Sequence, residues 1–141
     1  TTIGEALDSF DARVQEFERD YIKMLTNVIK CGLKTTLCTI YNPYFDHDNM
    51  DRINYMFPLN ANFNKLQRRC TTALPLFNNI IFQEAFNFGI PVMDLRLIFS
   101  DREDYANPIE PSVVGGLKMA KIIKEISNNH DFSSKNSVVY K

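Results

Sequence analysis

The sequence predicts an α/β protein: a doubly wound parallel sheet of the three-layer, flavodoxin-like kind, of which this chain supplies only a part. Apolar residues recur at helical spacing in three segments, two short β-rich runs lie between them, and turn residues separate the elements. The order helix–strand–helix–strand–helix is the one that parallel strands with crossover helices require. With 141 residues and 45% hydrophobic residues, the chain is long and apolar enough for one domain with its own core.

The first helix is predicted from Ile3 to about Ile29. Its apolar residues alternate at spacings of four and three, so they form one stripe that faces a core. Gly32 is the residue expected just past the end of this helix. The run Leu33–Ile40 is short and rich in β-branched residues, which predicts a buried strand that Tyr41-Asn42-Pro43 ends.

The middle of the chain is less regular and then returns to helical spacing. Asp46–Cys70 is polar, aromatic and rich in asparagine, and we expect an irregular excursion or a short helix there. Ala73–Phe88 has helical spacing, and Gly89 is expected to end that helix. The apolar run Ile90–Leu95 predicts the second strand.

A polar loop follows the second strand and leads into a third helix, predicted from Ser112 to Ile126. Ser112 is the expected N-cap, because its hydroxyl can accept a hydrogen bond from the free N–H groups of the first turn. The domain portion is expected to span residues 1–126. Residues 127–141 read as a polar tail, in which Ser137–Tyr140 could pair as an edge strand.

Two parallel strands do not make a stable sheet alone. Each leaves a row of unpaired backbone N–H and C=O groups, and a buried unpaired group costs about 1–3 kcal/mol. We therefore expect the missing strands to come from the other half of the domain or from a second chain. Pairing with a copy of this chain is the alternative.

The loop and the start of the third helix, DYANPIEPSVVGGLKMA (Asp104–Ala120), carry a family resemblance. They resemble the last conserved block of SGNH/GDSL-type hydrolases, in which Asp-x-x-His supplies the acid and base of a Ser-His-Asp triad. Aligned on Pro111, Ser112 and Gly115, the chain has Glu110 at the histidine position and Asn107 at the aspartate position. CTIYNPYF and DLRLIFSDREDYANPIEPS are similar to a bacterial SGNH-like subgroup with the glutamate form, and the resemblance runs roughly from Ala6 to Ile126.

The family's Gly-Asp-Ser nucleophile block and Gly-x-Asn-Asp oxyanion block are absent from these 141 residues. The chain therefore resembles the carboxyl-terminal half of an SGNH-like domain. The resemblance implies hydrolysis of a small ester or acyl substrate, with serine and oxyanion donors supplied elsewhere and no activity of this chain alone. The alternative is a non-catalytic SGNH-like module that binds a ligand or assembles with a partner.

Each candidate site residue also has a structural interpretation. Glu110 is a candidate base, although an anion before a helix is also favoured by the helix dipole, and that is the interpretation we prefer. Asn107 could orient Glu110, and it could also be an ordinary turn residue before proline. Ser112 is expected to be a cap rather than a nucleophile.

Four further residues are candidates for the wall of a substrate cleft. Tyr41 and Asn42 end the first strand on the same side of the sheet, where aromatic packing under the loop is the favoured alternative. Arg96 could bind a substrate carboxylate, but a pair with a neighbouring carboxylate that fixes the loop is favoured. Asp104 opens the loop.

Composition excludes several classes of function. A net charge of −1 implies no general attraction to nucleic acid, and the absence of a long apolar segment predicts no membrane span. Three cysteines without a Cys-x-x-Cys pair favour a reducing, cytoplasmic environment. We expect no cofactor and no metal, and interpret one acidic cluster as a solvated loop: Asp46, His47, Asp48 and Asp51.

Overall fold

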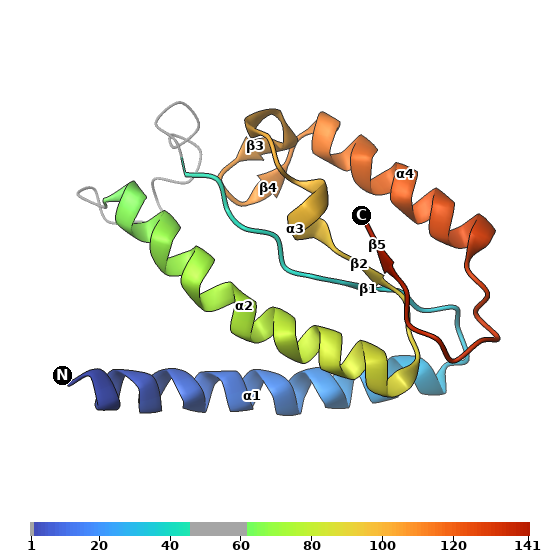
Figure 1. Ribbon diagram of the computed structural model, residues 1–141, viewed down its shortest axis with the longest axis horizontal. Helices are drawn as coiled ribbons and strands as arrows, with labels where there is room; N and C mark the ends of the chain where they lie inside the picture. The colour runs from blue at the N-terminus through green and yellow to red at the C-terminus, as the bar shows by residue number, and fades with distance from the viewer. Residues whose placement is uncertain (1, 46–61) are drawn as a thin grey trace.

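The computed structural model of the chain describes residues 2–45 and 62–141. They form a mixed α/β fold with three long helices, a small parallel sheet and a small antiparallel sheet (Figure 1). The α/β class is confirmed at this level. The larger doubly wound sheet stays a prediction.

Helix α1 (Ile3–Lys30) matches the predicted first helix. Thr2 caps it: its hydroxyl accepts from the Glu5 N–H, while the Glu5 carboxylate accepts from the Thr2 N–H. Gly32 follows the C-cap with a φ of 68°, a left-handed conformation that glycine adopts without steric cost.

Helix α2 (Phe63–Phe88) ends where predicted but begins ten residues before Ala73. Of the two alternatives for Asp46–Cys70, an irregular excursion or a short helix, the helix describes Phe63–Cys70, where it forms the start of the longer α2. The Asn62 side chain accepts a hydrogen bond from the Lys65 N–H and so caps the helix. The first two turns of α2 are mostly polar, so apolar periodicity does not reveal them. At the other end Gly89 has a φ of 65°.

The parallel sheet has the order β1–β2–β5, formed by Leu37–Cys38, Val92–Met93 and Val139–Tyr140. Leu37 pairs with Val92 and Val92 with Val139, so β2 is central and all three strands run in one direction. The strand predicted at Ser137–Tyr140 is confirmed. The regular ladders are shorter than the predicted apolar runs, and Leu95, predicted as the end of the second strand, begins a short helix capped by Asp94.

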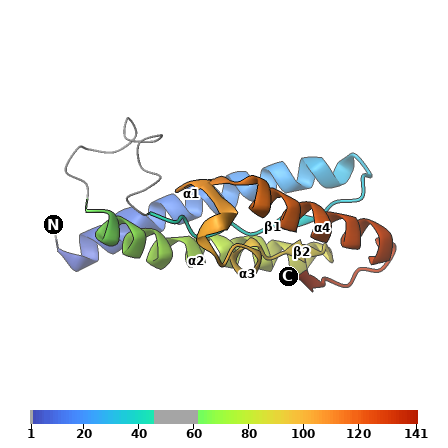
Figure 2. The ribbon, with the colours of Figure 1, turned by 90° about the horizontal axis from the view of Figure 1, so that it is seen from above.

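Helices cover the two faces of this sheet. On one face α1 and α2 pack on a core of Leu25, Leu37, Ile81, Ala85, Ile90 and Val92. The opposite face packs against the fourth helix, α4 (Val113–Asn129), and its core includes Met93, Ile122 and Ile126. Figures 1 and 2 show α4 on the side of the sheet opposite α1 and α2.

Between β2 and α4 the chain forms a compact loop region rather than an open loop. It contains the short helix α3 (Leu95–Ile98), the 3-10 turn η3 (Arg102–Asp104), and an antiparallel hairpin of β3 (Tyr105–Asn107) and β4 (Glu110–Pro111). Ser112 is the N-cap of α4, as predicted. Within 2–45 and 62–141, no helix has the length and hydropathy needed to cross a bilayer.

Candidate functional site

The candidate residues lie at the carboxyl end of the parallel strands, around the β3–β4 hairpin. The segment after β1 supplies Tyr41 and Asn42, and the segment after β2 begins with Asp94. The hairpin supplies Asn107 and Glu110. In open α/β sheets this end of the strands is where ligands bind.

Asn107 and Glu110 form a direct side-chain pair. Asn107 is buried, with 4% of its surface exposed, and its Nδ2 donates to Glu110 Oε2 over 2.5 Å. The Asn107 Oδ1 accepts from the backbone N–H groups of Ile109 and Glu110, each at 3.0 Å. Those two donors fix the orientation of the amide, because its oxygen must face them and its NH₂ group must then face Glu110.

Glu110 does not cap α4. Its side chain is exposed and bonds Asn107, whereas the Ser112 hydroxyl accepts from the N–H groups of Val114 and Gly115. The same hydroxyl donates to the Glu103 carbonyl, so its role is structural. Ser112 rather than Glu110 is thus the N-cap of α4, and Glu110 is a solvent-exposed carboxylate held by a buried amide, while its interaction with the helix dipole stays a prediction.

Tyr41 and Asn42 each form a hydrogen bond to the β3–β4 hairpin. The Tyr41 hydroxyl donates to the Ile109 carbonyl over 2.7 Å, and its ring packs edge-on against Phe99. Burial, with the nearby charge of Glu110, raises the pKa of Tyr41. The Asn42 carbonyl accepts from the Tyr105 hydroxyl over 2.8 Å.

Tyr105 is the centre of this aromatic packing. It stacks on Tyr44, and burial together with Tyr41 and Asp104 raises the pKa of Tyr105 to about 12. The favoured alternative for the end of β1, aromatic packing under the loop, describes the observed contacts.

Arg96 pairs with Asp94, two residues earlier. Its Nε and a terminal guanidinium nitrogen donate to the two Asp94 oxygens over 2.8 and 2.6 Å, and the Thr39 hydroxyl donates to Asp94 Oδ1. Burial of Asp94 acts against its charge, but the bonds from Arg96 and Thr39 outweigh it and lower the pKa of Asp94. The Arg96–Asp94 pair fixes the start of the loop after β2, which is the structural role favoured for Arg96, and the Thr39 bond ties Asp94 to the end of β1.

Asp104 is fully buried and anchors the loop to α4. Its Oδ2 accepts from the N–H groups of Ser100 and Asp101, and Lys118 Nζ lies 2.8 Å from Oδ2 and 2.7 Å from Oδ1. Burial opposes the Asp104 charge, but these bonds outweigh it and lower the pKa of Asp104. Sequence reasoning missed Lys118, although a lysine among the apolar residues of VVGGLKMA was an available signal.

The structure thus separates the candidates into three groups. Asn107 and Glu110 form a polar pair whose carboxylate is open to solvent. Arg96 and Asp104 are engaged in ion pairs, while Tyr41 and Asn42 hold the hairpin. Across the described ranges no group of three or more metal-ligating side chains occurs, and the acidic cluster at Asp46–Asp51 lies outside them.

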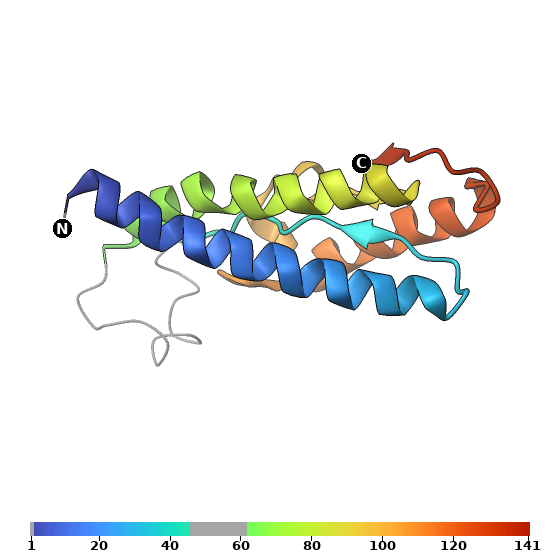
Figure 3. The same cartoon turned by 90° about the horizontal axis from the view of Figure 1, so that it is seen from below.

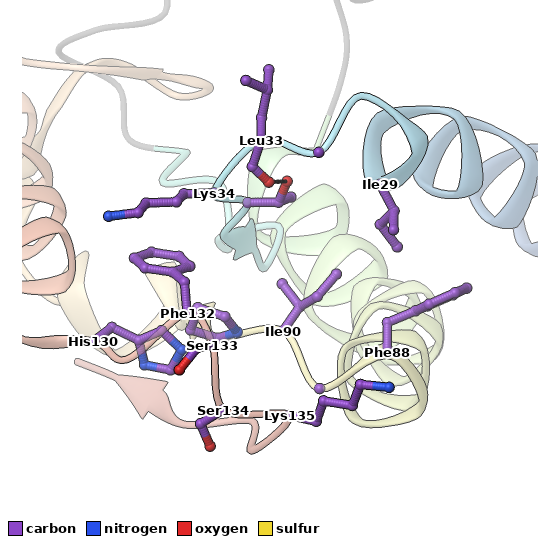
Figure 4. A pocket seen from close by; sticks show the side chains of 14 residues that line it. Ile29, Leu33, Lys34, Phe88, Ile90, His130, Phe132, Ser133, Ser134 and Lys135 are labelled. Atoms are coloured by element: carbon purple, nitrogen blue, oxygen red, sulfur yellow. Dashed lines mark hydrogen bonds between the residues drawn. The ribbon is translucent and has the colours of Figure 1, made fainter.

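A separate pocket of about 300 Å³ lies at the opposite, amino end of the strands (Figure 4). His130, Lys34 and Lys135 are among its lining residues. The two ammonium groups extend to opposite sides, so they do not converge on one anion. This pocket lacks the paired polar groups found at Asn107 and Glu110.

A scan against protein-family models, a search of curated proteins and a search of solved structures each return no match.

Proposed function

We propose that the chain is the carboxyl-terminal part of an SGNH/GDSL-like hydrolase domain that acts on ester or acyl bonds. The observation that carries the proposal is the Asn107–Glu110 pair. In the resembling family these two positions hold an Asp and a His, which are hydrogen-bonded partners in acid–base chemistry. Here the partners keep the contact and exchange donor and acceptor, since the amide donates and the carboxylate accepts.

In the proposed mechanism, Glu110 is the general base and Asn107 is a positioning residue. Asn107 leaves the second Glu110 oxygen free to accept the proton of a serine hydroxyl, which then attacks the substrate carbonyl. In the complete domain the serine-bearing part would cover this carboxylate and exclude water from it.

The rest of the domain supplies what this chain lacks. Serine and the donors that stabilise the oxyanion come from the other half of the domain or from a second chain, which also extends the parallel sheet into a doubly wound, three-layer one. The cysteines Cys31, Cys38 and Cys70 are unpaired, which fits a reducing compartment such as the cytoplasm.

A second candidate function is a binding module of the same shape. It is favoured by the Ser112 hydroxyl, which is fully engaged in capping α4, and by the exposure of Glu110. Such a module would hold a ligand or partner with the Glu110 carboxylate and perform no turnover.

The test is Glu110→Gln in the complete domain, assayed with short p-nitrophenyl esters. Glutamine keeps the size of the side chain and removes the base, so turnover should fall by at least about 100-fold. Glu103→Gln changes an exposed carboxylate at the surface of η3 and serves as the matched control, with turnover unchanged. Equal turnover in Glu110→Gln and the unaltered protein would refute the catalytic role, and no turnover in the unaltered complete domain would favour the binding module.

A further inference from the structure

The outer edge of β1 carries unused backbone hydrogen-bonding groups. The N–H groups of Leu37 and Thr39 donate inward to the carbonyls of Pro91 and Met93. Because successive residues of a strand point their backbone groups to opposite sides, those of Cys38 face outward. Among the described residues no strand lies on that side, since β1 is the first strand of the order β1–β2–β5.

This edge is closed at one end by a side chain. The Asn78 amide of α2 accepts from the Ile40 N–H over 2.7 Å and donates to the Ile40 carbonyl over 2.8 Å. The buried amide therefore occupies the place of a neighbouring strand at Ile40. The open part of the edge lies before it, around Thr36 and Cys38.

Apolar surface flanks the open edge on the α4 side. A groove of about 500 Å³ lies between β1 and α4, with Cys38, Met93, Met119 and Ile123 among its lining residues. On α4 itself, the groove residue Ile123 is 50% exposed. A strand paired with β1 would place its alternate side chains over this surface.

Topology indicates the direction of the missing strand. Helix α1 shares a face of the sheet with α2, and Figures 2 and 3 place α1 on the side of the sheet away from β5. The β1–α2–β2 crossover has the right-handed sense that is usual for parallel strands, whereas β2–α4–β5, which moves the same way along the sheet with its helix on the opposite face, has the other sense. Because α1 lies on the same face as α2, a parallel strand that leads into α1 with the sense of β1–α2–β2 would lie outside β1, at the open edge.

We propose that the β1 edge around Cys38 binds a parallel β-strand whose apolar side chains fill the groove under α4. The inference rests on the proposed function only for the source of that strand, which is the other part of the hydrolase-like domain. The pairing stops at Ile40, where Asn78 already satisfies the backbone.

The test compares amide hydrogen exchange in the 141-residue chain alone and in the assembly isolated from its natural source. In the chain alone the Cys38 amide should exchange rapidly, whereas in the natural assembly it should exchange at least about 100-fold more slowly. Rapid exchange of Cys38 in the natural assembly would overturn the proposal. So would an assembly of two copies joined at Cys38 of each.

Two variants at Cys38 test how much its outward-facing backbone N–H contributes to the assembly. Cys38→Pro removes that donor and leaves the inward bonds of Leu37 and Thr39, so the natural assembly should be at least about tenfold weaker. Cys38→Ala keeps the donor, and its assembly should be unchanged. Equal weakening in both variants would overturn the proposal, and if Cys38→Pro does not fold, the exchange comparison decides. If the Cys38 amide is protected from exchange in an assembly that shows no ester turnover, the proposed strand pairing at β1 is supported and the proposed hydrolase function is refuted.

Discussion

The loop region between β2 and α4 differs from the outer edge of β1 in how completely its polar groups are paired within the chain. In the loop region between β2 and α4, the buried side chains of Asp94, Asp104 and Asn107 all have polar partners within the chain. At the outer edge of β1, the backbone of Cys38 faces away from the sheet beside an exposed apolar surface. The polar groups of the candidate site are thus paired within the chain, whereas at the β1 edge no described strand pairs with Cys38, and there we propose a further strand.

The largest effect is expected from breaking the ion pair that anchors the loop region. Lys118→Met leaves the buried Asp104 carboxylate without the ammonium group that pairs with it, so the free energy of unfolding should fall by more than in any variant below. Lys121→Met on the exposed side of α4 is the control and should change it little. Urea unfolding followed by circular dichroism measures both, and equal values would mean that the pair does not anchor the loop.

The close approach of α4 to the loop is tested at a glycine pair. A Cβ on Gly115 would lie 2.3 Å from the Asp104 carbonyl oxygen and 2.6 Å from Phe99, whereas nothing lies within 4 Å of one on Gly116. Gly115→Ala should therefore cost about 2 kcal/mol of stability through overpacking. Gly116→Ala should be neutral or stabilise the helix by up to about 1 kcal/mol. The same urea titration compares them, and a stable Gly115→Ala protein would contradict the packing described.

The closed end of the β1 edge is tested through Asn78. Asn78→Leu keeps the size of the side chain and leaves the Ile40 N–H and carbonyl without partners, which should cost about 1–3 kcal/mol. The exposed edge becomes longer, so the variant should also associate more strongly. Asn79→Leu, at an exposed position of α2, is the control. Sedimentation velocity would show whether the two variants differ.

The smallest expected effect is the dependence of stability on acid. The pKa values of Asp94 and Asp104 are lowered in the folded state, so the unfolded state binds more protons as the pH falls. The stability that these groups contribute is complete above the unfolded pKa of about 3.9 and is lost as the pH falls through the lower folded pKa values. Urea midpoints between about pH 2 and pH 6 should show this loss, and Asp104→Asn should reduce it. An unchanged profile in Asp104→Asn would contradict the role of the ion pair.

The parts of the fold that depend on local pattern could be predicted from the sequence. Apolar periodicity located α1 and the end of α2, and the chemistry of Ser112 located the start of α4. The first turns of α2 were missed because they are polar, and only the cap at Asn62 marks them.

The features that depend on long-range contacts could not be predicted in the same way. The Asp104–Lys118 pair and the Asn78–Ile40 bonds join residues far apart in sequence, which spacing does not reveal. The close approach at Gly115, within α4, is of the same kind, since a side chain there would collide with the backbone of Asp104 and the ring of Phe99. The Asn107–Glu110 contact is the exception, since three residues separate the partners and a hairpin brings them together.

The central claim is that the sheet ends in an open edge at β1, and it is tested most directly by amide exchange at three consecutive residues of the chain alone. Inward-facing Leu37 and Thr39 should be protected, and Cys38 between them should exchange at a rate close to that of an unfolded peptide. Protection of Cys38 equal to that of its two neighbours, in a monomer, would show that the chain covers its own edge and would contradict the account.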